Sequence, residues 1–155
     1  MGEKDQVIAL FPGLKQDNDF IITSSRTPDY NCIAWAFHYN NRWMWPKTPG
    51  SLWVDGWSYW PDGIEHSEDV SFFIKAFEQK GYCVCDNSSF EDGFRKVALY
   101  VKKDTTECTH AARQLSNGKW TSKLGSLNDI QHGTPYSIEG DYYGVVHCIM
   151  KIPFR

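Results

Sequence analysis

The chain has 155 residues, of which 41% are hydrophobic and 23% are charged, and its formal net charge at pH 7 is −3. This length fits one domain of about 100–200 residues, so we expect a single domain over residues 1–155. The small acidic charge argues against nucleic-acid binding, which needs a basic surface. No apolar run approaches the roughly 20 residues that cross a bilayer, which argues against a membrane partner.

The cysteine content indicates free thiols. The number of cysteines is odd, and the N-terminus has Glu3, Lys4 and Asp5 before a very short apolar patch, which is not a secretory signal. We therefore expect a reducing compartment, by default the cytoplasm, or export by a route that needs no signal peptide. The cysteines are Cys32, Cys83, Cys85, Cys108 and Cys148.

Residues 27–37 predict a short, largely buried helix. Pro28 and either Asp29 or Asn31 are helix-start signals, and the apolar residues that follow give one buried face. Cys32 therefore lies in the first turn of this helix.

Residues 43–61 are rich in Trp, Pro and Gly, which predicts an irregular segment. Its aromatic side chains suit either a platform for carbohydrate or peptide, or a flap whose Trp rings complete a sparse core. We favour the flap.

The clearest helix is predicted over residues 67–80, with Ser67 as N-cap and Gly81 as the stop. Strands follow it, so the order of elements favours an α+β fold with an antiparallel sheet. The predicted strands are 82–85, 96–101, 109–115, 119–124 and 144–152.

Residues 116–118, Ser-Asn-Gly, predict a tight hairpin turn. If Leu115 faces Trp120, His110 shares its face of the sheet with the odd-numbered residues of the second strand. A one-residue bulge would place Ser122 on the face of His110 instead.

Cys32 is the candidate nucleophile. A cysteine attacks as the thiolate, which a helix N-terminus favours through its dipole and its free N–H groups. The same N–H groups can hold the oxyanion that forms on an attacked carbonyl. The alternative is that Cys32 is a small buried hydrophobic residue without a chemical role.

His110 is the candidate base, because it begins a strand after a polar segment, where a side chain can be both anchored and exposed. A third polar group usually fixes the imidazole tautomer. Ser122 and His132, the latter expected in the loop after the hairpin, are candidates, whereas Asn128 and Asp129 are poorly placed. His147 lies in mid-strand and is as well explained as a core residue.

A helix-borne cysteine followed by a sheet that carries a histidine resembles the layout of papain-like and NlpC-type thiol hydrolases. The segments 30–36, 96–100, 109–115 and 118–125 also resemble an uncharacterised bacterial family, over about Tyr30 to His132. The resemblance implies a papain-like α+β domain in which a short helix carrying Cys32 packs on an antiparallel sheet, with one longer helix beside it.

We therefore expect a cysteine peptidase or amidase that acts on a peptide or another amide, with Cys32 attacking and His110 accepting the proton. The alternative is a catalytically silent binding or regulatory domain on the same fold, with a protein partner, for example in a bacterial conflict system. Neither interpretation needs a cofactor. Cys83 and Cys85 are one residue apart, unlike the Cys-x-x-Cys spacing of zinc sites, so we expect two core thiols and no metal site.

Overall fold

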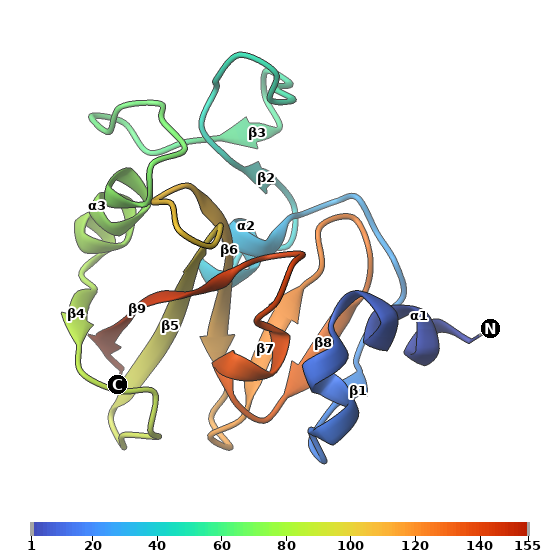
Figure 1. Ribbon diagram of the computed structural model, residues 1–155. Coiled ribbons are helices and arrows are strands. Elements are labelled where there is room, and N and C mark those ends of the chain that lie inside the picture. Colours follow the sequence, from blue (N-terminus) through green and yellow to red (C-terminus); the bar gives the residue numbers. More distant parts are fainter. Residues whose placement is uncertain (1, 155) are drawn as a thin grey trace.

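The computed structural model describes residues 2–154 and contains a seven-stranded antiparallel sheet with the strand order β1-β8-β7-β6-β5-β9-β4 (Figure 1). Its strands are β1 (Ile21–Ile22), β4 (Cys83–Cys85), β5 (Phe94–Val101), β6 (Cys108–Gln114), β7 (Trp120–Lys123), β8 (Asp129–His132) and β9 (Val145–Pro153). The helices are α1 (Glu3–Leu10), α2 (Cys32–Ala36) and α3 (Val70–Lys80), with the short 3-10 helices η1 (Pro12–Gln16) and η2 (Pro135–Ile138). The predicted mixed α+β architecture with an antiparallel sheet is confirmed.

The sheet separates two buried clusters. Along β5, Val97, Leu99 and Val101 point toward the cluster that contains α2 and α3. Ala98 and Tyr100 point the other way, toward the N-terminal segment that covers the opposite face. Figure 1 shows this segment, α1 and η1, beside β8 and away from α3.

The start of α2 is fixed by Asn31. Its side-chain oxygen accepts hydrogen bonds from the N–H groups of Ala34 (3.1 Å) and Met44 (3.0 Å), and its Nδ2 donates to the Met44 carbonyl (2.8 Å). One side chain therefore caps the helix and ties it to the Trp-rich segment. The predicted short buried helix with Cys32 in its first turn is confirmed.

The longer helix, α3, begins later than predicted. Asp69 is its N-cap and accepts the Ser71 N–H at 3.0 Å, whereas Ser67 accepts the N–H of Asp69 at 3.1 Å in the preceding turn. The assignment of Ser67 as N-cap was wrong, because Ser67 forms the turn before the helix. Gly81, with φ 113°, ends the helix as predicted.

The hairpin between β6 and β7 has a register one residue away from the expected one. Gln114 faces Trp120, and the loop closes between the Leu115 N–H and the Lys119 carbonyl at 2.7 Å. Gly118 has φ 84°, which gives the longer turn with a bulge rather than a two-residue turn. Ser122 consequently lies on the His110 face of the sheet.

The Trp-rich segment is irregular except for β2 (Trp43–Met44) and β3 (Ser58–Tyr59), which pair in parallel. The rings of Trp45 and Trp60 pack on Phe73 of α3, with centroids 5.1 and 5.0 Å away. These rings complete the core on the α3 side of the sheet, as the flap interpretation predicts.

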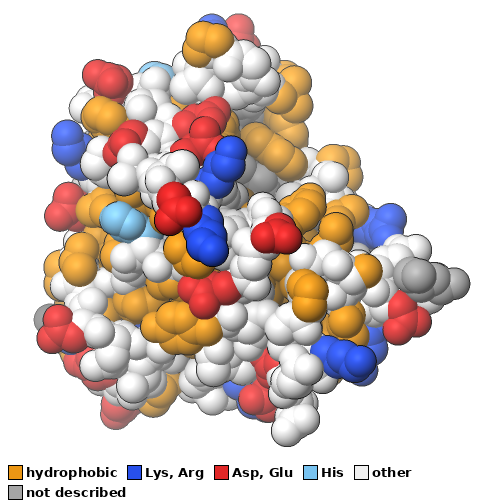
Figure 2. Space-filling view, viewed as in Figure 1, with side chains coloured by type: hydrophobic (Ala, Val, Ile, Leu, Met, Phe, Trp, Pro, Cys, Tyr) orange, Lys and Arg blue, Asp and Glu red, His pale blue; other side chains and the backbone are white. Residues whose placement is uncertain are grey.

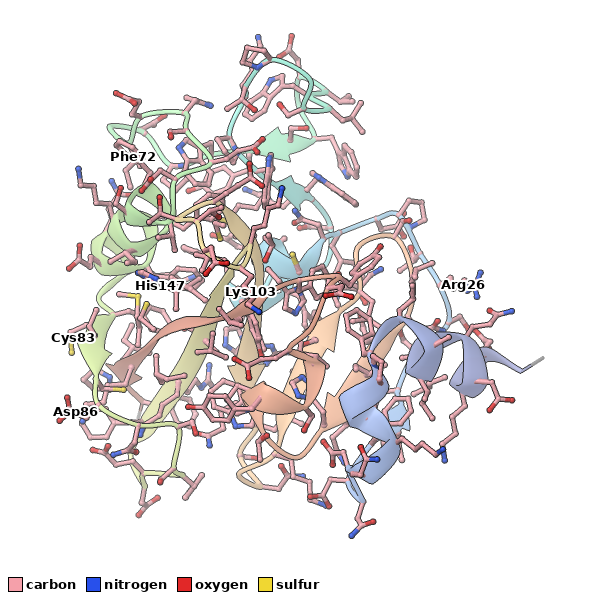
Figure 3. All side chains as sticks on the ribbon, viewed as in Figure 1. Arg26, Phe72, Cys83, Asp86, Lys103 and His147 are labelled. Carbon is pink, nitrogen blue, oxygen red and sulfur yellow. The ribbon has the colours of Figure 1, made fainter. Side chains whose placement is uncertain are left out.

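One expectation for the C-terminal half of the chain was wrong, and one alternative that the sequence left open is decided. Cys83 is not a core thiol, because it is exposed on β4 at the edge of the sheet (Figure 3). His147 is exposed on β9 rather than buried in the core. No helix within residues 2–154 is both long enough and apolar enough to cross a membrane.

Candidate active site

Cys32 lies at the end of α2 that faces a cavity. Its side chain is only 5% exposed, yet it lines this cavity of about 400 Å³ together with Thr109 of β6 and Tyr143. The Trp-rich segment also lines the cavity, through Trp43 and Trp45. Cys32 is therefore shielded from bulk water and borders a space that can hold a ligand.

The surroundings of Cys32 keep its thiol protonated. Burial raises the pKa of Cys32 to about 11, although the N–H groups of Ala111, Ile33 and Cys32 itself and the charge of Lys123 act in the opposite direction.

His110 of β6 is completely buried between aromatic rings. The ring of Tyr143 stacks on it with centroids 4.0 Å apart and an interplanar angle of 12°. Tyr100, its partner on β5, meets it edge-on at 5.1 Å. Tyr143 thus contacts His110 on one side and lines the Cys32 cavity on the other.

His110, Ser122 and His132 form one hydrogen-bonded chain. The His110 Nε2 lies 3.0 Å from the Ser122 Oγ, which lies 2.8 Å from the His132 Nε2. The His132 Nδ1 lies 2.7 Å from the carbonyl oxygen of Thr134. His132 is on β8 and not in a loop, so that expectation was wrong.

This chain fixes the tautomer of His110. The Thr134 carbonyl can only accept, so the Nδ1 of His132 carries a proton and donates it. In neutral His132 the Nε2 is then an acceptor for the Ser122 hydroxyl, and the Ser122 oxygen accepts from the Nε2–H of His110. The remaining nitrogen of His110, Nδ1, is an unprotonated acceptor, and it is buried with no hydrogen-bond partner among residues 2–154.

Burial keeps both histidines neutral. It lowers the pKa of His132 to about 4, and it lowers the pKa of His110 well below its usual value, with a further contribution from the charge of His132. At neutral pH the site therefore holds a protonated thiol and an uncharged imidazole.

Cys32 and His110 belong to different faces of the sheet. His110 shares the face of Tyr100, whereas Ala111 and Cys32 belong to the α2 cluster. The paired residues of β6 and β7 are only those next to the hairpin, Arg113 with Thr121 and Gln114 with Trp120. Farther from the hairpin, β6 and β7 are linked by the hydrogen bond between the side chains of His110 and Ser122. Helix α2 contacts both of these strands. No hydrogen bond within residues 2–154 joins Cys32 to His110.

A family model matches residues 21–151 of the chain. The chain belongs to the family described as "Domain of unknown function (DUF7689)". The matched range includes Cys32, His110, Ser122 and His132. No curated protein and no solved structure matches the chain.

In this DUF7689 domain, Tyr143 is the site residue that the sequence did not indicate. Its position is fixed by a hydrogen bond from the Thr109 hydroxyl to its carbonyl oxygen. The only local signal is the Tyr142–Tyr143 pair between two glycines, which does not predict stacking on a distant histidine.

Asn128 and Asp129 of the DUF7689 domain serve other contacts. Asn128 donates to Glu3 and to the Ser24 carbonyl, and Asp129 accepts the Tyr30 hydroxyl at 2.5 Å. These bonds connect β8 to the N-terminal segment and lie outside the histidine chain. Within residues 2–154 no group of three or more His, Cys, Asp or Glu side chains is arranged to hold a metal ion.

Proposed function

We propose that the chain is a papain-like or NlpC-type cysteine hydrolase that cleaves an amide bond, with Cys32 as nucleophile and His110 as base. The observation that carries the proposal is the free Nδ1 of buried His110, whose other nitrogen is held by Ser122. A buried polar atom without a partner is rare, and a catalytic role is one of the explanations for it. The arrangement matches the requirement that a base be oriented by a third group.

The first step begins from the neutral pair. The Cys32 sulfur forms a bond to the amide carbonyl carbon as its proton passes to His110 Nδ1. His110 then returns this proton to the amide nitrogen, the carbon–nitrogen bond breaks, and the amine leaves. Water hydrolyses the resulting thioester, with His110 again accepting a proton and returning it to the Cys32 sulfur.

The step requires the sulfur and Nδ1 to meet across the gap between β6 and β7. Helix α2 contacts both strands, and the N–H of Ala111, the residue after His110, is among the groups that lower the pKa of Cys32. Ser122 and His132 act as positioning residues, because they hold the protonated Nε2 of His110 and so keep Nδ1 unprotonated.

The cavity beside Cys32 favours an amide substrate with an apolar or aromatic group. Its walls include Trp43, Trp45 and Leu52, with Glu68 as the charged residue. The Glu68 carboxylate already accepts from the Trp45 ring N–H (3.1 Å) and the Thr48 hydroxyl (2.9 Å). Substrate recognition therefore rests on the aromatic walls, and a peptide is the simplest amide of this kind.

A Phe-Leu dipeptide vinyl sulfone tests the proposal. Because the reagent needs both a thiol and a proton donor, we expect a covalent adduct on Cys32, located by peptide mass spectrometry. His110→Asn should slow its formation by about 100-fold or more, the usual contribution of a general base. His147→Asn, an exposed histidine on β9, is the matched control and should leave the rate unchanged.

Thermal melts establish that each variant is folded, and Ser122→Ala is the second variant if His110→Asn does not fold. An adduct on exposed Cys83 in place of Cys32, or an equal rate in His110→Asn, would contradict the enzyme proposal.

The second candidate is a catalytically silent binding domain that uses the same cavity for a protein partner. The raised pKa and the low exposure of Cys32 favour it, since a buried neutral thiol reacts slowly. The same experiment separates the two functions, because a silent domain forms no adduct that depends on His110.

A further inference from the structure

Two arginines lie at the other end of α2, and neither has a carboxylate partner among residues 2–154. Arg95 of β5 and Arg113 of β6 point to the same face of the sheet, the face that α2 covers. The Arg113 guanidinium lies over the Trp35 ring at 4.3 Å, and the Arg95 guanidinium lies over the Phe154 ring at 3.6 Å. The rings hold both planar groups in place.

Within residues 2–154, neither guanidinium forms an ion pair with a carboxylate. The ion pairs within residues 2–154 involve four other cations, Arg26, Lys96, Lys119 and Lys151. The Nη1 of Arg113 donates to the Nδ1 of His38 at 3.2 Å, and the Nε of Arg113 is buried without a partner. The Arg113 guanidinium therefore has N–H donors without an acceptor among residues 2–154. Leaving such donors unpaired costs free energy unless a ligand accepts hydrogen bonds from them.

The basic groups here are close enough to repel one another. Burial and the charges of Arg113, Arg95 and Lys80 lower the pKa of His38 to about 4. Burial and the charge of Arg95 lower the pKa of Arg113, whereas Asp129 and the hydroxyl groups of Tyr82 and Tyr30 act in the opposite direction. Elsewhere, on the face shown in Figure 2, positive and negative side chains are interspersed. The positive side chains at the end of α2 therefore form a local basic cluster in a chain whose net charge is −3.

A cavity of about 500 Å³ opens beside these side chains. It is lined by Arg95, Arg113 and His38, and also by the rings of Phe90 and Phe154. Among residues 2–154, Asp92 is the one carboxylate of the lining, and it is exposed and forms no ion pair with either arginine. The cavity thus combines a cationic wall with an aromatic wall.

We propose that this cavity binds a small organic anion, with its phosphate or carboxylate group between Arg95 and Arg113 and its apolar or aromatic body against Phe90 and Phe154. Guanidinium groups match the planar oxygen pairs of carboxylates and phosphates, and fixed aromatic contacts reduce the entropy that binding costs. The site is separate from the Cys32 cavity, so it stands whether or not the chain is a hydrolase.

Calorimetric titration with phenyl phosphate, benzoate, inorganic phosphate and neutral phenol tests the proposal. Phenyl phosphate or benzoate should bind at least tenfold more tightly than phenol, and the stronger of the two identifies the preferred acid group. Phenyl phosphate should also bind more tightly than inorganic phosphate, because only phenyl phosphate has a ring that can contact Phe90 and Phe154. Arg95→Gln and Arg113→Gln should each weaken binding about tenfold or more, as expected for loss of a charge-assisted hydrogen bond.

Arg26→Gln is the matched control, because Arg26 is an exposed arginine beside α1 (Figure 3) and pairs with Glu3. It should leave the affinity unchanged. Arg95 is the safer variant if Arg113→Gln unfolds, since Arg113 packs on Trp35. Equal binding of phenol and phenyl phosphate, or equal weakening by Arg26→Gln, would overturn the proposal.

Discussion

Ser122 and Lys123 are neighbours on β7, but they belong to buried polar clusters that differ in one respect. The Lys123 ammonium has three protons, and it donates them to the carbonyl oxygens of Thr27 (2.8 Å), Gly125 (2.7 Å) and Leu127. On the other face, Ser122 links two histidines, and one nitrogen of His110 remains without a partner. The first cluster is complete, whereas the second has one free acceptor.

The difference separates a structural role from a chemical one. A buried charge whose donors are all satisfied stabilises the fold and has nothing left for a substrate. A neutral imidazole with one fixed nitrogen and one free nitrogen is arranged to take up a proton. The predictions below test this contrast, from the largest expected effect to the smallest.

Removal of the Lys123 ammonium should have the largest effect on stability. Lys123→Met leaves three carbonyl groups without their donor inside the protein, so we expect the free energy of unfolding to fall by about 3–5 kcal/mol. Urea denaturation measures the change. Lys119→Met removes a surface ion pair with Asp19 and should cost less than about 1 kcal/mol. Similar losses for both variants would mean that the Lys123 cluster is not structural.

Acidification should act on the histidine cluster. The folded-state pKa of His132 is about 4, below its value of about 6.5 in the unfolded chain. Unfolding therefore takes up a proton, so the stabilising effect is fully present above pH 6.5 and is lost as the pH falls toward 4. A shift of this size corresponds to about 3 kcal/mol, and His110 adds to the loss in the same direction.

Urea unfolding at pH 7.5 and pH 4.5 measures this loss. His132→Gln should reduce the difference in unfolding free energy between the two pH values, and His147→Asn should not. If His132→Gln keeps the full pH dependence, His132 is not the neutral buried group described above.

The sequence predicted the position of Cys32 better than the surroundings of His110. Asp29 and Asn31 before an apolar run are local signals of a helix start, and Asn31 is the one that caps the helix. His110, Ser122 and His132 come from three strands, so their meeting depends on strand register, which a single bulge at Gly118 changes by one residue. The expected register placed odd-numbered residues beside His110, and only the bulge alternative gave Ser122.

The stacked Tyr143 and the later start of α3 could not be predicted in the same way. Tyr143 reaches His110 through a long-range contact that has no periodic pattern. At the start of α3, Ser67 and Asp69 are both good N-cap residues, and the choice between them depends on the contact of the Asp69 carboxylate with the Thr106 hydroxyl at 2.7 Å. Tertiary contacts decided both features.

Removal of the Ser122 hydroxyl should have an intermediate effect. Ser122→Ala leaves both Nε2 atoms of the histidine chain without a partner, so we expect a loss of about 2 kcal/mol. It should also slow the reaction of Cys32 with the vinyl sulfone, because His110 can then adopt the other tautomer. Ser116→Ala, in the exposed hairpin turn, is the control for both measurements. A fully active Ser122→Ala would remove Ser122 from the site.

The hairpin turn should show the smallest effect. Gly118→Ala places a side chain at φ 84°, which we expect to cost about 1 kcal/mol. The new Cβ would lie 3.5 Å from Phe90, an ordinary contact, so the cost comes from the backbone conformation. Gly118→Asn should recover part of the loss, because Asn tolerates this conformation better. Equal melting temperatures for the Ala and Asn variants would contradict this explanation.

The most direct test of the central claim is the protonation state of His110, measured from the ¹⁵N chemical shifts of its ring by NMR at pH 7. We predict a neutral ring with a protonated Nε2 and an unprotonated Nδ1, which becomes the opposite or a mixed tautomer in Ser122→Ala. A doubly protonated ring, or a neutral ring with the proton on Nδ1, would contradict the assignment of His110 as the base for Cys32.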